Sequence, residues 1–480
     1  MASKKKFDFA AHIQEALNDS QLRSNFKFAM GTMIQKRKAV FADPEETAAL
    51  RRTGNAIKRR CLSRLPALLE KLEKKCTENG IVVHWAETTA EANNIVLDIM
   101  KRHDATRLVK GKSMVSEEMH LNRFLEERNI EALETDLGEF IIQLNNEPPS
   151  HIIVPAIHKN RKQVAQIFHE KLKDTPYVEE VEKLNAIARK TLREKFRMGQ
   201  VGLSGVNFAV AETGTLVLVE NEGNGRMCTT VPPVHIALMG LEKVVEKLDD
   251  VPPLLRLLTG SATGQIITTY VNMITSPRKK GEKDGPTEVH LVILDNGRSK
   301  MLADRQLRQT LQCIRCGTCL NHCPVYTRIG GHAYGSVYPG PIGKILTPQI
   351  DGLDLKGSLA TASSLCNACQ EVCPVMIPIP AIIRRMRDES YGNCADSHAE
   401  TIIKGHGFKK NIIESIVWKG WAAVYRLPYL NRLTTRMLGR FGHRLPKVGP
   451  LKAWTSVRTT PKFAPKSLHD LAKEEGIRDE

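Results

Sequence analysis

The stretch Cys313-x2-Cys316-x2-Cys319-x3-Cys323-Pro324 determines how the second half of this chain is expected to fold. A second run, Cys366-x2-Cys369-x3-Cys373-Pro374, follows it. Thiolates are soft ligands that hold iron, and gaps of two residues let three sulfurs of one loop converge on one face of an iron-sulfur cubane. Helical sequence patterns flank both runs. Together they predict an α-helical domain built around two iron-sulfur clusters.

The ligands of the two clusters are expected to cross between the runs. In two-cluster ferredoxins the fourth cysteine of a run ligates the other cluster, and the proline behind it turns the chain away. We therefore predict two 4Fe-4S clusters. The thiols predicted for cluster 1 are Cys313, Cys316, Cys319 and Cys373. Those predicted for cluster 2 are Cys323, Cys366 and Cys369.

Cluster 2 lacks an obvious fourth thiolate, because Ser363 stands where the first run has its leading cysteine. Three outcomes are open at this point. Ser363 binds through its oxygen, Cys394 reaches in from downstream, or the position takes an exogenous ligand or is left vacant in a 3Fe-4S cluster. We favour a cluster held by three thiolates, since a lone downstream cysteine is more often a small buried residue than a ligand.

Zinc and disulfides are the two other chemistries that such cysteines serve. A structural zinc ion uses four ligands, whereas seven cysteines gather in these two runs, and zinc sites do not need the Cys-Pro step. Disulfide frameworks belong to small secreted domains, but this chain has 480 residues and begins without an apolar export segment. Iron-sulfur ligation is therefore the favoured chemistry.

The charge of the chain is strongly positive, with a net value of +17 and a sequence pI of about 9.4. Between Thr401 and His469 there are 14 Lys and Arg residues and a single acidic residue, Glu414. Such a stretch suits an anionic membrane surface, an acidic partner protein or a nucleic acid. Nucleic acid is the least expected partner, because no P-loop or RNA-binding signature accompanies the charge.

No apolar run approaches the roughly eighteen residues that a membrane-spanning helix needs. A reducing cytoplasm suits cluster thiolates, so we expect a cytoplasmic protein, either free or peripheral at the membrane.

Alternating strand and helix patterns predict the architecture of the first half. Residues 1–78 form a helical N-terminal arm that packs on the next domain. Residues 79–298 form an open, mostly parallel α/β sheet domain. Its expected elements are strands at 81–85, 107–109 and 132–136, helices at 89–103 and 117–128, buried central strands at 152–154 and 216–219, and a last strand at 290–294.

The second half divides into two predicted helical parts. Residues 299–395 form the α-helical ferredoxin-like 4Fe-4S domain, which opens with a helix over 302–312. Residues 396–480 form a basic helical C-terminal region, in which apolar residues from Ile412 to Val424 recur at helical spacing.

The α/β domain also offers candidate substrate contacts. Arg226 follows a glycine-rich turn near a predicted strand end, where its guanidinium fork would suit a substrate carboxylate. Tight turns use the same residue types without any ligand. No dinucleotide-binding fingerprint appears, since Cys228 stands where the third small residue is required. We assign no catalytic residue.

Three further stretches complete a resemblance to a known family. They are residues 110–118 (Lys-Gly-Lys-Ser-Met-Val-Ser-Glu-Glu), residues 134–139 (Glu-Thr-Asp-Leu-Gly-Glu) and residues 211–216 (Ala-Glu-Thr-Gly-Thr-Leu). With the cysteine runs behind them, they resemble the iron-sulfur members of the lactate-utilisation-domain family. The resemblance implies an α/β fold similar to sugar-phosphate isomerases and formyltetrahydrofolate cyclo-ligases, and two 4Fe-4S clusters. It also implies a role in oxidising L-lactate to pyruvate beside two sister proteins, one cysteine-rich and one a smaller lactate-utilisation-domain protein.

The sequence is consistent with three functions. The first is an electron-transfer subunit of a lactate-oxidising system with an unidentified electron acceptor. It is favoured by seven thiolates in ferredoxin spacing and by the family resemblance. Hydride removal is a two-electron step and a cluster passes one electron at a time, so a partner must split the pair. The second is an oxidoreductase with its own substrate site in the α/β domain. The third is a redox-sensing, nucleic-acid-binding iron-sulfur protein.

Overall fold

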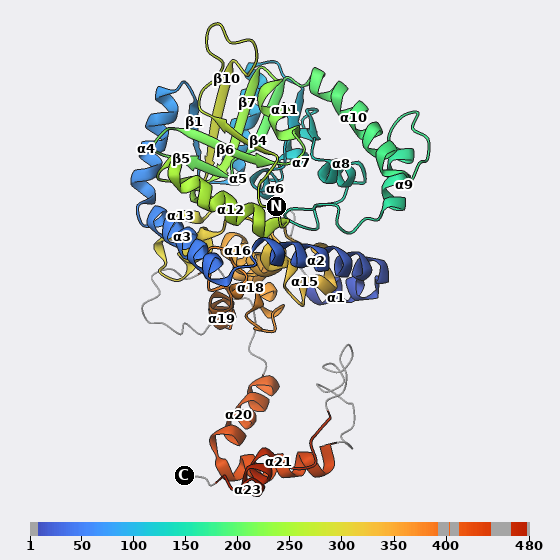
Figure 1. Cartoon of the computed structure of the whole chain (residues 1–480), viewed down its shortest axis with the longest axis vertical. Helices are drawn as coiled ribbons and strands as arrows, with labels where there is room; N and C mark the ends of the chain where they lie inside the picture. The colour runs from blue at the N-terminus through green and yellow to red at the C-terminus, as the bar shows by residue number, and fades with distance from the viewer. Residues whose placement is uncertain (1–7, 392–402, 404–411, 443–461, 478–480) are drawn as a thin grey trace. The chain divides into compact units, whose positions relative to one another are not determined.

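The computed structural model describes residues 8–391, 403, 412–442 and 462–477 (Figure 1). The chain divides into two compact units, residues 1–408 and residues 409–480, which are described separately. The first unit contains both sheets and both cysteine runs.

The centre of the first unit is a six-stranded parallel sheet of order β1-β10-β7-β4-β2-β3. The expected mostly parallel α/β sheet is therefore confirmed. Strands β7 and β10 are apolar and buried along nearly their whole length, as the inner strands of a covered sheet must be. The strands are β1 (Val82–Ala86), β2 (Arg107–Lys110), β3 (Glu131–Glu134), β4 (Val201–Gly205), β7 (Val234–Gly240) and β10 (Glu288–Leu294).

The direction of winding reverses between β2 and β4. From β2 the chain proceeds outward to β3 at one edge, and from β4 it proceeds the other way through β7 to β10. In open parallel sheets, ligands bind at the carboxyl ends of the two strands that flank such a reversal. The loops after β2 and β4 are therefore the expected ligand-binding loops.

Helices cover one face of the sheet. Ile236 and Leu238 of β7 pack there with Val96 and Met100 of α5 and with Leu125 of α7. The side chains that alternate with them along β7 point to the other face, into a larger buried cluster. The helices of the α/β region are α5 (Thr89–Arg102), α6 (Met114–Glu118), α7 (Leu121–Glu126), α8 (Leu137–Leu144), α9 (Arg161–Lys171), α10 (Val181–Met198), α11 (Asn224–Thr230) and α12 (Val251–Ala262).

A second, four-stranded sheet of order β8-β5-β6-β9 lies beside the first. Its strands are β5 (Phe208–Val210), β6 (Thr215–Glu220), β8 (Val244–Val245) and β9 (Tyr270–Ile274). The apolar run 216–219 belongs to β6, which pairs antiparallel with β5 and β9. Placing that run in the central parallel sheet was wrong, because an antiparallel strand buried on both faces has the same continuous apolar pattern.

Two other expected elements differ from the structure. Residues 152–154 form no strand, since the backbone N–H groups of Ile153 and Val154 donate to Nδ1 of His151 (3.0 and 3.1 Å) instead of to a neighbouring strand. The helix expected over 117–128 is divided into α6 and α7. The division falls at His120, whose φ of +51° ends one helix before the next begins.

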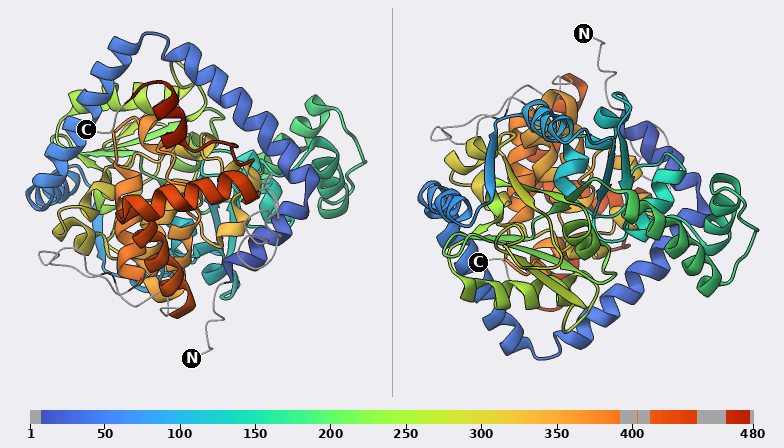
Figure 2. Two further views of the ribbon diagram at one scale, coloured as in Figure 1. Left: turned by 90° about the horizontal axis from the view of Figure 1, so that it is seen from below. Right: turned by 90° about the horizontal axis from the view of Figure 1, so that it is seen from above.

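The N-terminal helices contact both the sheets and the cysteine region. They are α1 (Phe9–Asn18), α2 (Ser20–Val40), α3 (Pro44–Ser63) and α4 (Leu65–Glu78), and Figure 2 shows them in blue along the margin of the first unit. Helix α4 packs on β1 and β8, whereas α2 packs on α14 (Thr318–Asn321) and α15 (Tyr326–Ile329) of the cysteine region. The ring of Phe26 meets Tyr326 edge-on, with centroids 5.5 Å apart. The arm therefore covers the cysteine region as well as the α/β domain.

The cysteine region is helical throughout its described residues. It contains α13 (Arg298–Ala303), η3 (Leu307–Gln312), α14 (Thr318–Asn321), α15 (Tyr326–Ile329), η4 (His332–Tyr334), α16 (Gly340–Asp351), α17 (Leu353–Lys356), η5 (Gly357–Thr361), α18 (Ala368–Glu371) and α19 (Ile379–Ser390). The helix expected over 302–312 is interrupted after Ala303. There the Asp304 carboxylate accepts hydrogen bonds from the N–H groups of Gln306 and Leu307, both at 2.8 Å.

The second unit contains three described helices, α20 (Ile412–Arg426), α21 (Pro428–Phe441) and α23 (Leu468–Glu474). Helix α20 confirms the helical spacing of its apolar residues. Among the described helices of the whole chain, none is both long enough and apolar enough to cross a bilayer.

Candidate functional site

Four of the predicted ligand thiols line one cavity, which we call the first thiol cavity. Cys313, Cys316 and Cys319 enter it from the loop between η3 and α14, and Cys373 enters it from the turn after α18. Left-handed backbone conformations at Arg315 (φ +62°) and Gly317 (φ +72°) curl the loop around its sulfurs. The rest of the lining is mainly apolar, with Ile152, Ile314, Ile342, Val375, Ile377 and Ile379.

The other three predicted ligands line a separate cavity, which we call the second thiol cavity. Cys323, Cys366 and Cys369 lie there together with Ser363. The Ser363 hydroxyl accepts a hydrogen bond from the N–H of Leu365 (3.2 Å). Cys394, the alternative fourth ligand, falls outside the described residues. The structure therefore brings Ser363 to the three thiols.

The two thiol cavities differ in exposure. Cys316, Cys319 and Cys373 are buried in the first cavity, whereas Cys366 is exposed in the second. The first cavity is thus enclosed by protein, and the second is open to solvent at Cys366.

Burial favours the protonated form of Cys373 and Cys369 in the absence of iron. Burial raises the pKa of Cys373 to about 11. Burial and the nearby Cys323 thiol raise the pKa of Cys369 to about 12. Backbone N–H groups of Arg315 and Ile377 donate to the sulfurs of Cys313 (3.4 Å) and Cys373 (3.3 Å), and such donors favour bound thiolates. Binding of iron must therefore release protons.

The spacing of the thiols fits a polynuclear cluster better than a single zinc ion. Four thiolates on one zinc ion stand roughly 3.8 Å apart, given Zn–S bonds of about 2.3 Å in a tetrahedron. Among the described residues, no three cysteine sulfurs lie within 4.8 Å of one another. The ten described cysteines are also all free of disulfides. The donor set thus suits iron-sulfur clusters.

The N-terminal arm holds the second cysteine run through its backbone, which sequence analysis did not foresee. Arg51 donates from Nε (3.1 Å) and Nη2 (2.9 Å) to the carbonyl oxygen of Cys373. Asn55 donates to the carbonyl oxygen of Val375 at 2.7 Å. These contacts fix the turn that carries Cys373 into the first thiol cavity. Some 320 residues of chain separate the partners, so no local pattern could reveal them.

A third cavity of about 400 Å³ lies at the winding reversal of the parallel sheet, and we call it the switch-point cavity. Residues 111–115 after β2 and residues 205–207 at the end of β4 line it. The segment after β7 contributes Glu242 and Lys243, and the loop of the first cysteine run contributes Arg315. Arg315 and Ile152 also line the first thiol cavity, so the two cavities share part of their wall.

A buried charge network joins the switch-point cavity to the cysteine region. Glu242 accepts from Nε of Arg298 (2.7 Å) and from Nη2 of Arg315 (3.0 Å). Burial alone would raise the pKa of Glu242, but the two guanidinium groups outweigh it and lower the pKa to about 2. Arg298 also pairs with Glu118, which accepts a 2.6 Å hydrogen bond from the hydroxyl of Tyr338. The network fixes Arg315 at the boundary of both cavities.

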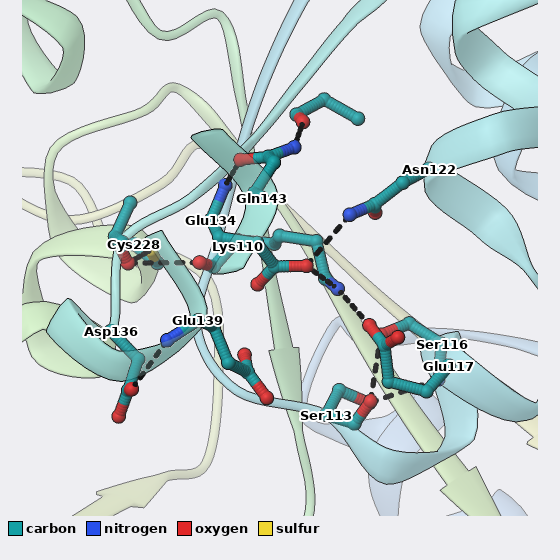
Figure 3. Close-up of polar contacts among 12 residues, drawn as sticks. Lys110, Ser113, Ser116, Glu117, Asn122, Glu134, Asp136, Glu139, Gln143 and Cys228 are labelled. Atoms are coloured by element: carbon teal, nitrogen blue, oxygen red, sulfur yellow. Dashed lines mark hydrogen bonds and ion pairs between the residues drawn. The ribbon is translucent and has the colours of Figure 1, made fainter. Parts of the chain in front are cut away.

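A second buried cluster holds the loops after β2 and β3 (Figure 3). The ammonium group of Lys110, which has no exposed surface, pairs with Glu134 and with Glu117 (2.9 Å). Burial would lower the pKa of Lys110, but the charges of Glu134, Glu117 and Glu139 raise it. Burial and the charge of Glu134 raise the pKa of Glu139 well above its usual range. This cluster positions the loop at residues 111–113, which lines the switch-point cavity.

Arg226, the candidate substrate contact from the sequence, is exposed and does not line the switch-point cavity. Its backbone N–H donates to Glu220 (2.6 Å), which is the role of a turn residue. The guanidinium group that lines the cavity belongs to Arg315.

Comparisons with known proteins agree with this organisation. The LUD domain family matches residues 69–294, and the 4Fe-4S dicluster domain family matches residues 309–377. The family described as lactate utilisation protein B, C-terminal, matches residues 385–477. A crystal structure of a DUF162 family protein from Deinococcus radiodurans shares 12% identity, covers 48% of this chain and 98% of its own, and gives a TM-score of 0.28.

Several relatives match this chain along nearly its whole length. Lactate utilization protein B from Bacillus thuringiensis (strain Al Hakam) is 39% identical over 485 aligned residues, which cover 98% of each chain. The proteins of that name from Bacillus cereus (strain AH187) and Bacillus anthracis (strain A0248) match equally well. The chain therefore belongs to the lactate utilization protein B family.

Proposed function

We propose that this protein is an iron-sulfur electron-transfer subunit in the oxidation of L-lactate to pyruvate. The observation that carries the proposal is the division of seven motif cysteines between two cavities, four in one and three in the other. The shared names of its relatives support lactate as the substrate of the system. When bound, each cluster would supply one-electron transfer.

The proposed ligands follow the contents of the cavities. Cluster 1 would be held by Cys313, Cys316, Cys319 and Cys373, which line the first thiol cavity. Cluster 2 would be held by Cys323, Cys366 and Cys369, which line the second. Ser363 lies beside those three thiols. Either its oxygen completes the ligand set, or cluster 2 is a three-thiolate or 3Fe-4S cluster.

The proposed domains follow the sequence boundaries. Residues 79–298 would form the lactate-utilisation domain with an isomerase-like or cyclo-ligase-like fold, behind a helical arm over 1–78. Residues 299–395 would form a ferredoxin-like domain, and residues 396–480 a basic region. That region carries the charge for an acidic partner or a membrane surface. A reducing cytoplasm would preserve the thiolates.

The protein's own residues would act mainly by positioning. Arg51 and Asn55 hold the second cysteine run, and Lys344 places an ammonium group beside Cys323. The sequence has no nicotinamide or flavin fingerprint. A sister protein would therefore separate the two electrons that are removed from lactate. The two proposed partners are a second cysteine-rich protein and a smaller lactate-utilisation-domain protein, and a further carrier would accept the electrons.

The test separates this relay from an independent enzyme. The anaerobically reconstituted protein is mixed with L-lactate and an artificial electron acceptor, alone and with the two sister proteins. We expect pyruvate only when the sister proteins are present, with bleaching of the cluster absorption. Pyruvate formation by the isolated protein would instead favour an oxidoreductase with its own substrate site, which the switch-point cavity makes the second candidate.

A further inference from the structure

We propose that the switch-point cavity binds a small carboxylate anion of the 2-hydroxy or 2-oxo acid class at the end formed by Lys243 and Arg315. The chemical class of the ligand rests on the proposed function. The site itself rests on geometry and charge.

Its position is the first argument. Gly111 follows β2 and Gly205 is the last residue of β4, where the winding of the sheet reverses, and both line the cavity. The N–H of Gly111 donates to the carbonyl oxygen of Leu203 (2.8 Å), so the two strands stay paired up to the cavity. A side chain at Gly205 would come within 3.3 Å of the Lys112 carbonyl oxygen, so glycine keeps these loops close together. This is the place at which open parallel sheets bind ligands.

Two buried cations of the cavity, Lys243 and Arg315, have N–H groups that no described residue engages. Lys243 is 9% exposed, and among the described residues no hydrogen bond or ion pair engages its ammonium group. Arg315 is 8% exposed, and its Nη1 has no hydrogen-bond partner within the described structure. In the described part of the chain the ammonium group of Lys243 is a buried charge without a partner, which is costly. Arg315 pairs with Glu242 through Nη2 (3.0 Å) and keeps Nη1 as a donor, so a bound carboxylate could engage both groups. Lys112 lines the same cavity and adds a third positive charge.

The surroundings of Lys243 favour its neutral form. Burial and the charge of Arg315 lower the pKa of Lys243 to about 8. A negative ligand beside it would favour the charged ammonium group again.

The acidic residues of the cavity do not supply the missing anion, because each is engaged elsewhere. Glu242 is bound by Arg298 and Arg315, and Glu220 accepts the N–H groups of Gly225 and Arg226, both at 2.6 Å. Asp136 and Glu222 form an acidic part of the lining. They accept the N–H groups of Glu139 (3.1 Å) and Leu137 (3.3 Å). A carboxylate ligand is repelled from that part and directed to Lys243 and Arg315.

Polar groups for a second ligand oxygen lie in the same cavity. Asn207 lines it, and the side-chain oxygen of Asn207 accepts the N–H of Val219 (2.9 Å), which leaves its NH₂ group as a donor. Ser113 also lines it, and its hydroxyl oxygen accepts the N–H of Ser116 (3.3 Å). A 2-hydroxy or 2-oxo group next to the carboxylate matches such donors better than a plain alkyl chain does.

The test is a binding measurement on the cluster-loaded protein, without turnover. L-lactate, pyruvate and propionate are titrated anaerobically by calorimetry into wild type, Lys243→Met and Lys112→Met. The control is Lys162→Met, which removes an exposed lysine of α9. We expect lactate or pyruvate to bind wild type and the control alike, and propionate to bind more weakly. Lys243→Met should weaken binding about tenfold or more, as the loss of a charge-assisted hydrogen bond predicts.

The variants and outcomes keep this inference separate from the proposed function. Lys243→Arg keeps the charge and should retain most of the affinity, and iron content shows that each variant is folded. If cluster-loaded wild type binds none of the three acids, or if Lys243→Met binds lactate as wild type does, the inference is overturned. In either case the proposed electron-transfer role still stands. Failure of the proposed function is seen differently, as a protein that takes up no iron and sulfide.

Discussion

The ammonium nitrogen of Lys344 lies 3.5 Å from the sulfur of Cys323. Lys344 is 1% exposed in α16, so its charge is poorly screened by water. A positive charge stabilises the reduced, more negative form of a nearby cluster. Lys344→Met should therefore lower the reduction potential of cluster 2, by on the order of tens of millivolts.

An anaerobic redox titration followed by electron paramagnetic resonance measures this shift. Lys300→Met, which removes an exposed lysine of α13, is the control and should leave both potentials unchanged. An equal shift of both clusters in Lys344→Met would argue against the assignment of Cys323 to cluster 2.

Single cysteine replacements should affect the two clusters separately. Cys316→Ser removes a thiol of the first thiol cavity, and Cys366→Ser removes one of the second. Each variant should lose about half of its iron, because each cluster holds about four iron atoms. Cys76→Ala is the matched control, since Cys76 is buried in α4 away from the runs and should leave iron unchanged. Loss of all paramagnetic signals in both variants, with native folding retained, would count against two separate clusters.

A fourth thiol at residue 363 should complete cluster 2. Ser363 lines the same cavity as Cys323, Cys366 and Cys369, so Ser363→Cys places a sulfur where the first run has its leading cysteine. If wild type holds a 3Fe-4S cluster, the variant should gain one iron atom and lose the signal of the oxidised three-iron form. Mössbauer spectroscopy of the variant measures the change, with Ser63→Cys, at an exposed serine of α3 that does not line the cavity, as the control. An unchanged three-iron signal in Ser363→Cys would show that residue 363 does not face the cluster.

The grouping of the motif cysteines into two cavities was predictable from sequence, because most thiols of each cavity come from one short run with fixed spacing. The contacts that hold those runs were not predictable, since Arg51 reaches Cys373 across 322 residues. The charge of Arg315 could be seen in the first run, but its pairing with Glu242 depends on tertiary structure.

The parallel strands β2 and β10 were predictable because inner strands leave continuous apolar runs. Strand β1 lies at the edge of the sheet, and it was predictable from the alternation of strand and helix patterns that begins there. The same apolar pattern led to a wrong strand prediction at residues 152–154, where the chain forms a loop. Ile152 is apolar because it lines the first thiol cavity, and Ile153 donates its backbone N–H to His151. Apolar residues that wall a cluster cavity cannot be told from a buried strand by pattern alone.

The buried pair of Lys110 and Glu134 should be important for folding. Lys110→Met leaves the carboxylate of Glu134 buried without its cation, which costs roughly 3 to 5 kcal/mol of unfolding free energy. Urea unfolding followed by circular dichroism measures the loss. Lys183→Met breaks an exposed pair with Glu180 and should cost less than about 1 kcal/mol. Similar losses in the two variants would contradict the buried geometry.

Glu139 should make stability depend on pH. Its pKa in the folded protein is raised above the ordinary value of 4.5 by burial and by Glu134, and the charge of Asp136 adds to this. The folded state therefore holds a proton that the unfolded state releases, so stability is lost as pH rises from about 4.5 through the raised pKa. Glu139→Gln does not titrate. As pH rises, its unfolding free energy should increase relative to that of wild type by up to about 1.4 kcal/mol per pH unit.

Parallel urea titrations between pH 5 and pH 8 measure that difference, with the exposed Glu126→Gln as control. A constant difference between Glu139→Gln and wild type across the range would mean that Glu139 is ionised in the folded protein.

Seven cysteines that hold two iron-sulfur clusters should bind a defined amount of iron and sulfide. Iron, acid-labile sulfide and zinc are measured per chain on anaerobically reconstituted protein, together with the spectrum of the reduced form. We expect about eight iron and eight sulfide atoms per chain, or about seven iron atoms if cluster 2 is a 3Fe-4S cluster. Reduction should produce paramagnetic signals. A colourless protein with one zinc ion per chain and no sulfide would contradict it.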